Sequence, residues 1–467
     1  MKISLSFSGG ADEVTGSRHL LTCDSTRVLM DCGLFQGHRR EAIDKNRAFA
    51  FPVDSLTAVL LSHAHIDHSG GLPLLAKLGF KGPIHCTQPT ADLCRIMLLD
   101  SAFLQEEDAK YFNRIHQQDG QTIEALYTRA DAEAAIKLLK PHAYGEIFSV
   151  GDNLRVSFLN AGHVLGSAMV YVEMNTPKGK RRVLFTGDLG RRESILMKPP
   201  LIPQNVDYLL IESTYGNRVH ESIDTVEKTL ADLINEVVRD KGRILIPSFA
   251  LERTQEVIFL LEKLRRRNRI PPIHMYVDSP MATNITEVFD KHLECECLSS
   301  KFKDYIQKEG DPFGMDTVRY LRTVEESKSL NERPGEKIIL AGSGMCEGGR
   351  ILHHLRNNID KDNTIILLVG YQAQGTLGRR LAEGAKKVKI FGLEHGVRAS
   401  VRTIHNLSSH ADREDLQWFI RGLAPRPKNI FLVHGDVEQR ESLADQLKSI
   451  GIDRVETPRY GEEYELT

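Results

Sequence analysis

The sequence predicts an α/β fold in which a second α/β domain is inserted into the first, on three observations. Short apolar runs recur and stop at Gly, Asp, His or Ser, as in buried strands that deliver polar residues at their ends. Helical patterns separate many of these runs. Between about residues 213 and 385 the order strand–helix–strand repeats, as in a separate parallel sheet. We therefore expect a first domain over 1–212 and 386–467 and an inserted domain over 213–385.

The composition is that of an ordinary globular protein. Hydrophobic residues make up 41% and charged residues 27% of the 467 residues. No apolar stretch is long enough for a bilayer, and the N-terminal MKISLSFSGG lacks the features of a secretory signal. Seven scattered cysteines argue against a disulfide framework. We therefore expect a cytoplasmic protein with no membrane partner. The net charge of −2 excludes a globally basic protein but leaves room for a local basic groove.

The predicted first domain is built from short strands and two early helices. Helices are expected at 71–80 and 90–115, where apolar residues recur at helical spacing. The runs that predict its strands are LSFSGG (5–10), RVLMDCG (27–33), LTAVLLSH (56–63), VSFLNAGH (156–163), RVLFTGD (182–188) and YLLIEST (208–214).

The inserted domain has a different pattern of predicted helices and strands. A helix at 224–242 begins at an aspartate and ends at a glycine, and a strand at 243–250 and a helix at 251–268 follow it. Three further strands are expected at 273–279, 337–344 and 364–371. After residue 386, short strands at 387–392, 398–404 and 430–436 indicate a return to the first domain.

A cluster of metal-capable side chains follows one of these apolar runs. LLSHAHIDHSGG, residues 60–71, contains His63, His65, Asp67 and His68. On a continuing strand, His63 and His65 would share one face, and a turn after them would carry Asp67 and His68 to another side. One loop could then serve two adjacent ions. Imidazole and carboxylate ligands suit zinc, iron or manganese.

Further ligands are expected at other strand ends. His163 in NAGHVLGS, Asp188 in FTGDLG and His434 in FLVHGD each follow an apolar run and lie beside glycine. Asp31 in LMDCG is either another ligand or a group that orients one.

These motifs resemble a known family. H-x-H-x-D-H, followed by G-H and then G-D, resembles the signature of the metallo-β-lactamase fold. The inserted domain, the acidic residue of IEST and the histidines of SSHAD and LVHGD resemble its β-CASP branch, which contains nucleases of RNA and DNA. The match runs in order from Asp31 to His434. It implies an αβ/βα metallo-β-lactamase sandwich with an inserted β-CASP domain, and we expect a compact, bacterial-type member.

The resemblance implies a binuclear centre of two zinc ions, with iron or manganese as alternatives. One ion would be held by His63, His65 and His163, and the other by Asp67, His68 and His434. Asp188 would bridge the two ions, which suits a site that clamps a phosphodiester. His410, the histidine of SSHAD, would protonate the leaving oxygen, and Glu212 of IEST would favour its charged form. Asp31 and Asp188 complete the expected catalytic set.

The implied function is hydrolysis of single-stranded RNA by a zinc-dependent ribonuclease, which we expect to act endonucleolytically. His434 favours RNA because DNA-processing members of the branch typically carry valine there. Two alternatives are a small-molecule metallohydrolase such as a thioesterase and a non-catalytic RNA-processing scaffold. The inserted domain and His410 argue against the first, and the complete ligand set argues against the second. A homodimer is compatible with the sequence.

The inserted domain offers groups that could contact RNA. LAGSGMCEGGRILHHL runs from a strand through glycines into a helix, and its backbone N–H groups could bind a phosphate. Tight packing between strand and helix is the simpler explanation of such a turn. The candidate RNA contacts are Arg253, Ser343, Arg350 and Arg379.

Overall fold

The computed structural model describes residues 2–36, 44–116, 122–177, 179–220, 222–404 and 406–466. The chain forms two compact units. The first contains the residues up to Arg192, Met197–Val219 and the chain from His410 onward. The second contains Glu193–Leu196 and His220–Ser409. Each unit has its own sheets and its own apolar core.

The first unit is built on two seven-stranded sheets among the described residues. The first sheet has the order β22 (Glu463–Glu465), β1 (Ile3–Phe7), β2 (His19–Cys23), β3 (Thr26–Met30), β4 (Ala58–Leu60), β5 (Ile84–Thr87), β6 (Leu139–His142). The second has the order β21 (Val455–Glu456), β20 (Asn429–Val433), β11 (Tyr208–Glu212), β10 (Gly179–Phe185), β9 (Ala168–Thr176), β8 (Leu154–Asn160), β7 (Ile147–Val150).

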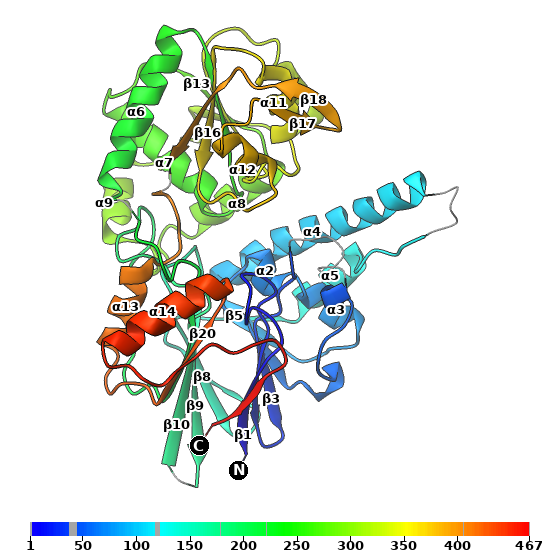
Figure 1. Ribbon diagram of the computed structural model, residues 1–467, viewed down its shortest axis with the longest axis vertical. Helices are drawn as coiled ribbons and strands as arrows, with labels where there is room; N and C mark the ends of the chain where they lie inside the picture. Colours follow the sequence, from blue (N-terminus) through cyan, green and yellow to red (C-terminus); the bar gives the residue numbers. More distant parts are fainter. Residues whose placement is uncertain are drawn as a thin grey trace. The chain divides into compact units, whose positions relative to one another are not determined.

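The two sheets of the first unit pack face to face (Figure 1). Alternate residues of β1, including Leu5 and Phe7, meet Phe158 of β8 and Phe185 of β10 in one apolar core. The strand pairs β3–β4 and β10–β11 are parallel, and the polar residues that follow these strands therefore emerge at one edge of each sheet.

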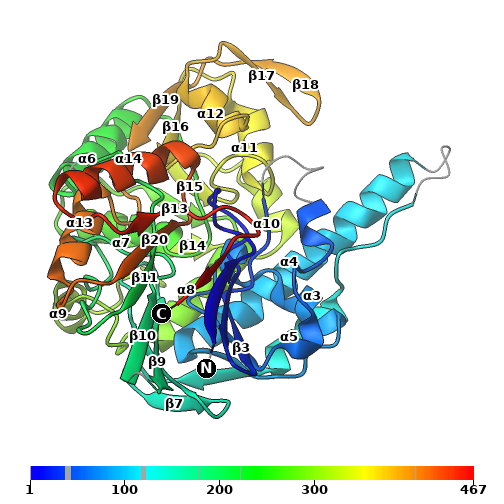
Figure 2. The same cartoon turned by 60° about the horizontal axis from the view of Figure 1, so that its bottom comes forward.

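Helices cover the outer faces of both sheets. On the second sheet, α13 (Arg413–Gly422) and α14 (Val437–Ser449) bury Phe419 and Leu447 in a separate apolar cluster. Beside the first sheet lie α3 (Leu72–Lys77), α4 (Gln88–Ile115) and α5 (Arg129–Lys137) (Figure 2). Two short helices, η1 (Val53–Ser55) and α2 (Ile66–Ser69), flank β4 in the chain. This arrangement confirms the predicted αβ/βα sandwich.

The second unit is built on a parallel sheet, as the repeated strand–helix–strand pattern predicts. Its order is β14 (Val318–Tyr320), β13 (His274–Val277), β15 (Lys337–Ala341), β12 (Arg243–Pro247), β16 (Thr364–Val369), β19 (Ser400–Ile404). A hairpin of β17 (Lys387–Ile390) and β18 (Leu393–Gly396) is separate from it. The helices are α6 (Asp224–Arg239), α7 (Arg253–Arg266), α8 (Pro280–Lys291), α9 (Ser300–Glu309), α10 (Val324–Ser329), α11 (Ile351–Asn358) and α12 (Leu377–Ala382).

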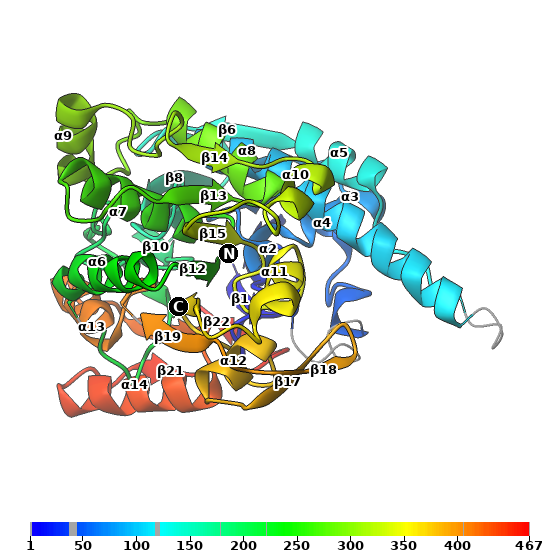
Figure 3. The same cartoon turned by 90° about the horizontal axis from the view of Figure 1, so that it is seen from above.

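Helices lie on both faces of this sheet (Figure 3). On one face, Leu245 of β12 and Ile366 of β16 pack with Ile351 of α11 and Leu381 of α12. On the other face α6 contacts both β12 and α7. A doubly covered sheet explains why its strands read as continuous apolar runs in the sequence.

The place where the chain re-enters the first unit lies later than residue 386. β17 contacts α12 and α11 of the second unit, β18 pairs with β17, and β19 pairs in parallel with β16 over five residue pairs. The chain joins the first unit at His410. Short strand-like runs alone therefore do not identify the sheet that they join. The domain boundaries at 213 and 385 stay predictions.

Candidate active site

The predicted metal ligands lie at strand ends of the first unit. His63 and His65 lie between β4 and α2, and Asp67 and His68 lie on α2 itself. His163, Asp188 and His434 follow β8, β10 and β20. The structure brings all seven of these side chains together in two groups.

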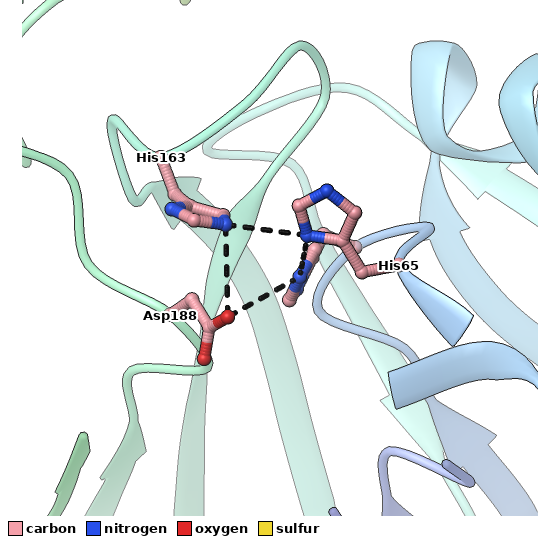
Figure 4. Close-up of side chains that lie close together, drawn as sticks. His65, His163 and Asp188 are labelled. Atoms are coloured by element: carbon pink, nitrogen blue, oxygen red, sulfur yellow. Dashed lines mark hydrogen bonds and ion pairs between the residues drawn. The ribbon is translucent and has the colours of Figure 1, made fainter. Parts of the chain in front are cut away.

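The first group contains His63, His65, His163 and Asp188, and Figure 4 shows three of them pointing toward one another. Nδ1 of His65 lies 3.1 Å from Nε2 of His63 and 3.3 Å from Nε2 of His163. Oδ2 of Asp188 lies 3.6 Å from Nε2 of both His63 and His163. A tetrahedral zinc ion with bonds of about 2.0–2.1 Å holds its ligand atoms about 3.3 Å apart. The donor atoms are therefore spaced as a metal requires.

The second group contains Asp67, His68 and His434. Nε2 of His68 lies 3.3 Å from Nε2 of His434, and Oδ2 of Asp67 lies 3.5 Å from that same nitrogen of His434. Asp188 reaches this group with its other oxygen, because Oδ1 lies 3.2 Å from Nε2 of His68. One carboxylate thus faces both groups.

Asp188 is the best evidence that the site fits metal ions. It is 2% exposed, and its Oδ1 is a buried oxygen that accepts no hydrogen bond from the described residues. Nitrogens of His68 and His434 lie 3.2 Å from it, but not in hydrogen-bonding geometry. A buried carboxylate oxygen without a donor is costly unless a cation binds it.

The charge balance of the site also suits metal binding, which uses ionised carboxylates and releases protons from any charged histidine ligand. Burial lowers the pKa of His65 to about 4. Burial raises the pKa of Asp67, but His68 and His434 together outweigh this effect and lower the pKa to about 2. His68 itself is surrounded by the carboxylates of Asp188, Asp31 and Asp67, which outweigh burial and raise its pKa well above the usual value. The buried site therefore attracts positive charge.

Asp31 lies against the ring of His68 and does not belong to either group of donors. Its Oδ2 lies 2.6 Å from Nδ1 of His68, which leaves Nε2 of His68 facing the second group. The same carboxylate accepts hydrogen bonds from the backbone and hydroxyl of Ser62 at 2.7 and 2.8 Å and from Ser17 at 3.4 Å. Of the two roles that the sequence allowed for Asp31, the structure supports the orienting one. Asp31 and His434 both adopt positive φ angles, of 59° and 49°, and such strain is often found at functional sites.

His410 and Glu212 form a pair beside Asp188. Nδ1 of His410 lies 3.2 Å from Oε1 of Glu212 and 3.9 Å from Oδ2 of Asp188. Glu212 is fully buried and also accepts a hydrogen bond from the backbone of Leu189 at 2.7 Å. Burial lowers the pKa of His410, but the carboxylates of Glu212, Asp188 and Asp67 together outweigh it and raise the pKa to about 9. These carboxylates therefore favour the protonated form of the ring.

The four predicted RNA contacts lie in the second unit and have protein partners there. Arg350 donates to Asp278 at 2.6 Å and to the carbonyl of Arg322 at 2.8 Å, so its guanidinium stabilises the unit itself. Arg253 is buried and donates to Glu256 at 2.6 Å. Arg379 pairs with Glu383 one helical turn away, and Ser343 accepts hydrogen bonds from the backbone of two residues in its own loop. Their contact with RNA stays a prediction.

Sequence reasoning missed the groups that support the ligands. Thr214 lies 3.3 Å from Nδ1 of His434 and hydrogen-bonds its carbonyl. Ser62 holds Asp31 and lies 3.0 Å from Nδ1 of His63. Ser62 directly follows an apolar run, and Thr214 comes three residues after Ile211, the last residue of another. Their position close to a strand end was the available signal.

Comparison with known families agrees with this geometry. The Metallo-beta-lactamase superfamily matches residues 19–248, and the Beta-Casp domain matches residues 254–381. The Zn-dependent metallo-hydrolase RNA specificity domain matches residues 394–458. Ribonuclease TTHA0252 of Thermus thermophilus is 35% identical over 97% of this chain and 98% of its own length. The chain belongs to the β-CASP branch of the metallo-β-lactamase superfamily. The resemblance seen in the sequence is confirmed.

Other relatives are similar over most of the chain. Transcription termination factor FttA of Methanothermobacter thermautotrophicus is 33% identical over 95% of this β-CASP chain and 68% of its own length. A crystal structure of a protein of unknown function from Enterococcus faecalis covers all of both chains with a TM-score of 0.53 and 14% identity, which supports the fold alone.

The donor groups and the family together show a divalent-metal site in a β-CASP hydrolase. Among the described residues, no helix has both the length and the apolar character needed to cross a membrane.

Proposed function

We propose that this chain is a zinc-dependent ribonuclease that cleaves phosphodiester bonds within single-stranded RNA. The observation that carries the proposal is the buried Asp188 carboxylate, which faces one donor group with each oxygen and lies beside the His410–Glu212 pair. The similarity to Ribonuclease TTHA0252 over nearly the whole of both chains supports RNA as the substrate. A cytoplasmic location and a homodimer stay predictions.

The residues would hold two zinc ions in separate donor groups. His63, His65 and His163 would bind one ion, and Asp67, His68 and His434 the other, with Asp188 between them. When bound, such a pair of ions supplies a nucleophile from water at neutral pH and neutralises charge on the phosphoryl oxygens. Asp31 would fix the ring of His68 through Nδ1, because Nε2 of that ring faces the second donor group.

His410 would complete the reaction as the general acid. Its Nδ1 faces Glu212, so Nε2 is the ring nitrogen that would deliver a proton to the leaving 3′ oxygen. The Glu212 carboxylate favours the protonated ring and limits its rotation. Departure of an alkoxide is unfavourable without such a proton.

Two alternatives fit less well. A small-molecule metallohydrolase has no need of the Beta-Casp domain at residues 254–381 or of a proton donor beside the ligands. A non-catalytic scaffold has no need of seven converging donors.

The direct test is incubation of purified protein with 5′-labelled and internally labelled single-stranded RNA, with and without chelator. We expect internal fragments that disappear with chelator, and elemental analysis near two zinc ions per chain. Mononucleotides released from the 5′ end would contradict endonucleolytic cleavage. A folded, metal-loaded protein that leaves RNA intact but hydrolyses a thioester would overturn the proposal.

A further inference from the structure

An exposed aromatic ring occupies the turn of the β17–β18 hairpin. The turn consists of Phe391 and Gly392, which both have positive φ angles, of 51° and 79°. A two-residue turn of this kind favours Asn, Asp or Gly at its first position, because a bulky side chain there is strained. Phe391 is nevertheless present and is 51% exposed. Hairpin stability does not explain this choice of residue.

The hairpin holds this ring at a fixed place on the second unit. Val388 and Ile390 point inward and are buried with Leu355 of α11. The ring of Phe391 lies 4.7 Å from the ring of His353, and Cζ of Arg356 lies 5.7 Å from its centroid. One part of the ring thus rests on α11, while about half of the side chain surface stays open to solvent.

The hairpin that carries the ring is basic, although the chain as a whole carries a net charge of −2. Lys386, Lys387 and Lys389 are exposed on the hairpin, where the last two alternate with the buried residues. Arg356 is exposed on α11. Glu394 pairs with Lys387 at 2.8 Å and lies opposite Lys389 in the hairpin. It is the one acidic residue in the sequence from 386 to 396, so the three lysines outnumber it. We call Phe391, His353, Arg356, Lys386 and Lys389 the hairpin patch.

We propose that the hairpin patch binds single-stranded RNA, with one base stacked on the ring of Phe391. An aromatic face beside Lys and Arg is the arrangement with which proteins hold single strands without reading their sequence, because every base has a face that can stack. The RNA specificity family begins its match at residue 394, within this hairpin. A protein partner would need a broader apolar surface than a ring surrounded by cations. The inference rests on the proposed function, since it assigns a contact for the same substrate.

Affinity for a fluorescent, unstructured RNA tests the proposal. Binding is measured by anisotropy in a His410→Ala background, so that the strand is not cut. Stacking contributes about 1–3 kcal/mol per base, which is about 5- to 150-fold in affinity. We expect Phe391→Ala to weaken binding by at least about fivefold and Phe391→Trp to retain it. Phe391→Leu keeps an apolar side chain but should bind as weakly as Phe391→Ala. The matched control is Phe103→Ala on α4, another exposed phenylalanine (57%).

Two further measurements isolate the stacked base. An RNA with abasic positions keeps its phosphates, so the difference between the parent and Phe391→Ala should vanish on that strand. The sequence has a single tryptophan, Trp418. In a Trp418→Phe background, the fluorescence of Phe391→Trp should therefore be quenched when RNA binds. The plot of log binding constant against log salt concentration should lose about 0.7 of its slope in Lys389→Ala. Lys228→Ala on α6 should leave that slope unchanged.

Thermal stability provides a further check, because a substitution at this turn should affect stability and RNA affinity differently. Phe391→Asn places a favoured turn residue at the positive φ angle, so its thermal midpoint should not fall while its RNA affinity does. Unchanged RNA affinity in Phe391→Ala, or full affinity in Phe391→Leu, overturns the stacking proposal. If the parent protein neither binds nor cleaves RNA, the proposed function itself fails. A parent that cleaves RNA, with Phe391 variants that bind normally, overturns the hairpin patch alone.

Discussion

Only one ring nitrogen of His68 can bind a metal ion, and the contact with Asp31 determines which one. The carboxylate accepts from Ser62 twice and from Nδ1 of His68 at once. In Asp31→Asn, the amide has one oxygen and would turn its NH2 group toward a donor. We expect affinity for one of the two ions and the rate of cleavage to fall about 10–100-fold, as for other partners of ligand histidines. Zinc titration with elemental analysis measures this, with the exposed Asp54→Asn as control. Unchanged affinity for both ions would refute the orienting role.

At the residue scale, the role of His410 can be tested separately from metal binding. His410→Ala should lose about 10²–10⁴-fold in rate and keep both ions. Glu212→Gln should lose less, because the ring remains. Replacing the leaving oxygen of a model phosphodiester by sulfur removes most of the need for a proton. The defect of His410→Ala should then shrink, while that of Asp188→Ala persists. Equal defects on both substrates, with chemistry rate-limiting, would show that His410 is not the acid.

At the scale of the elements, Asp278 joins β13 to α11 and α10. The carboxylate is fully buried, lies 2.7 Å from Nε2 of His354, and accepts from Arg350 at 2.6 Å and from Ser327. Burial raises the pKa of Asp278, but these three hydrogen bonds outweigh it and lower the pKa. Because the folded pKa is the lower one, this contribution to stability is complete above the unfolded pKa of about 3.9. It is lost as pH falls through the folded pKa.

Asp278→Asn should therefore destabilise the second unit most at neutral pH. Removing one partner of a buried pair costs about 3–5 kcal/mol. The difference from the parent should shrink as pH falls below about 4 and should be smallest below the folded pKa, where the parent aspartate is protonated as well. Hydrogen exchange of the β13 amides, measured at neutral pH and again below the folded pKa, tests this expectation. The control is Asp290→Asn, at an exposed position. A difference that stays constant with pH would contradict this account.

Much at the element scale could be predicted from local patterns. His163, Asp188 and His434 could be found because each follows an apolar run, and strand ends are visible in such runs. The role of Arg350 could not be predicted, because its partner Asp278 follows β13, 72 residues earlier in the chain, and no local pattern records that pairing. For the same reason β19 could be recognised as a strand, but its place beside β16 could not.

At the scale of the whole molecule, the ligands come from both sheets of the first unit. His63 and His68 follow β4 of one sheet, whereas His163 and His434 follow β8 and β20 of the other. Ions bound by both sets would hold the two sheets together at that edge. A ligand at 100 times its dissociation constant stabilises the folded state by about 2.7 kcal/mol per site. The metal centre is thus expected to stabilise the first unit as well as to serve its chemistry.

Chelation should therefore lower the stability of the first unit by several kcal/mol and leave the second unit unchanged. Hydrogen exchange read peptide by peptide distinguishes them, with β8 and β10 reporting on the first unit and β12 and β15 on the second. His410→Ala should respond to chelator as the parent does, because it keeps every ligand. His68→Ala should respond about half as much, because one donor group has already lost a ligand. Equal loss of protection in both units would mean that the ions stabilise the chain by another route than joining the two sheets.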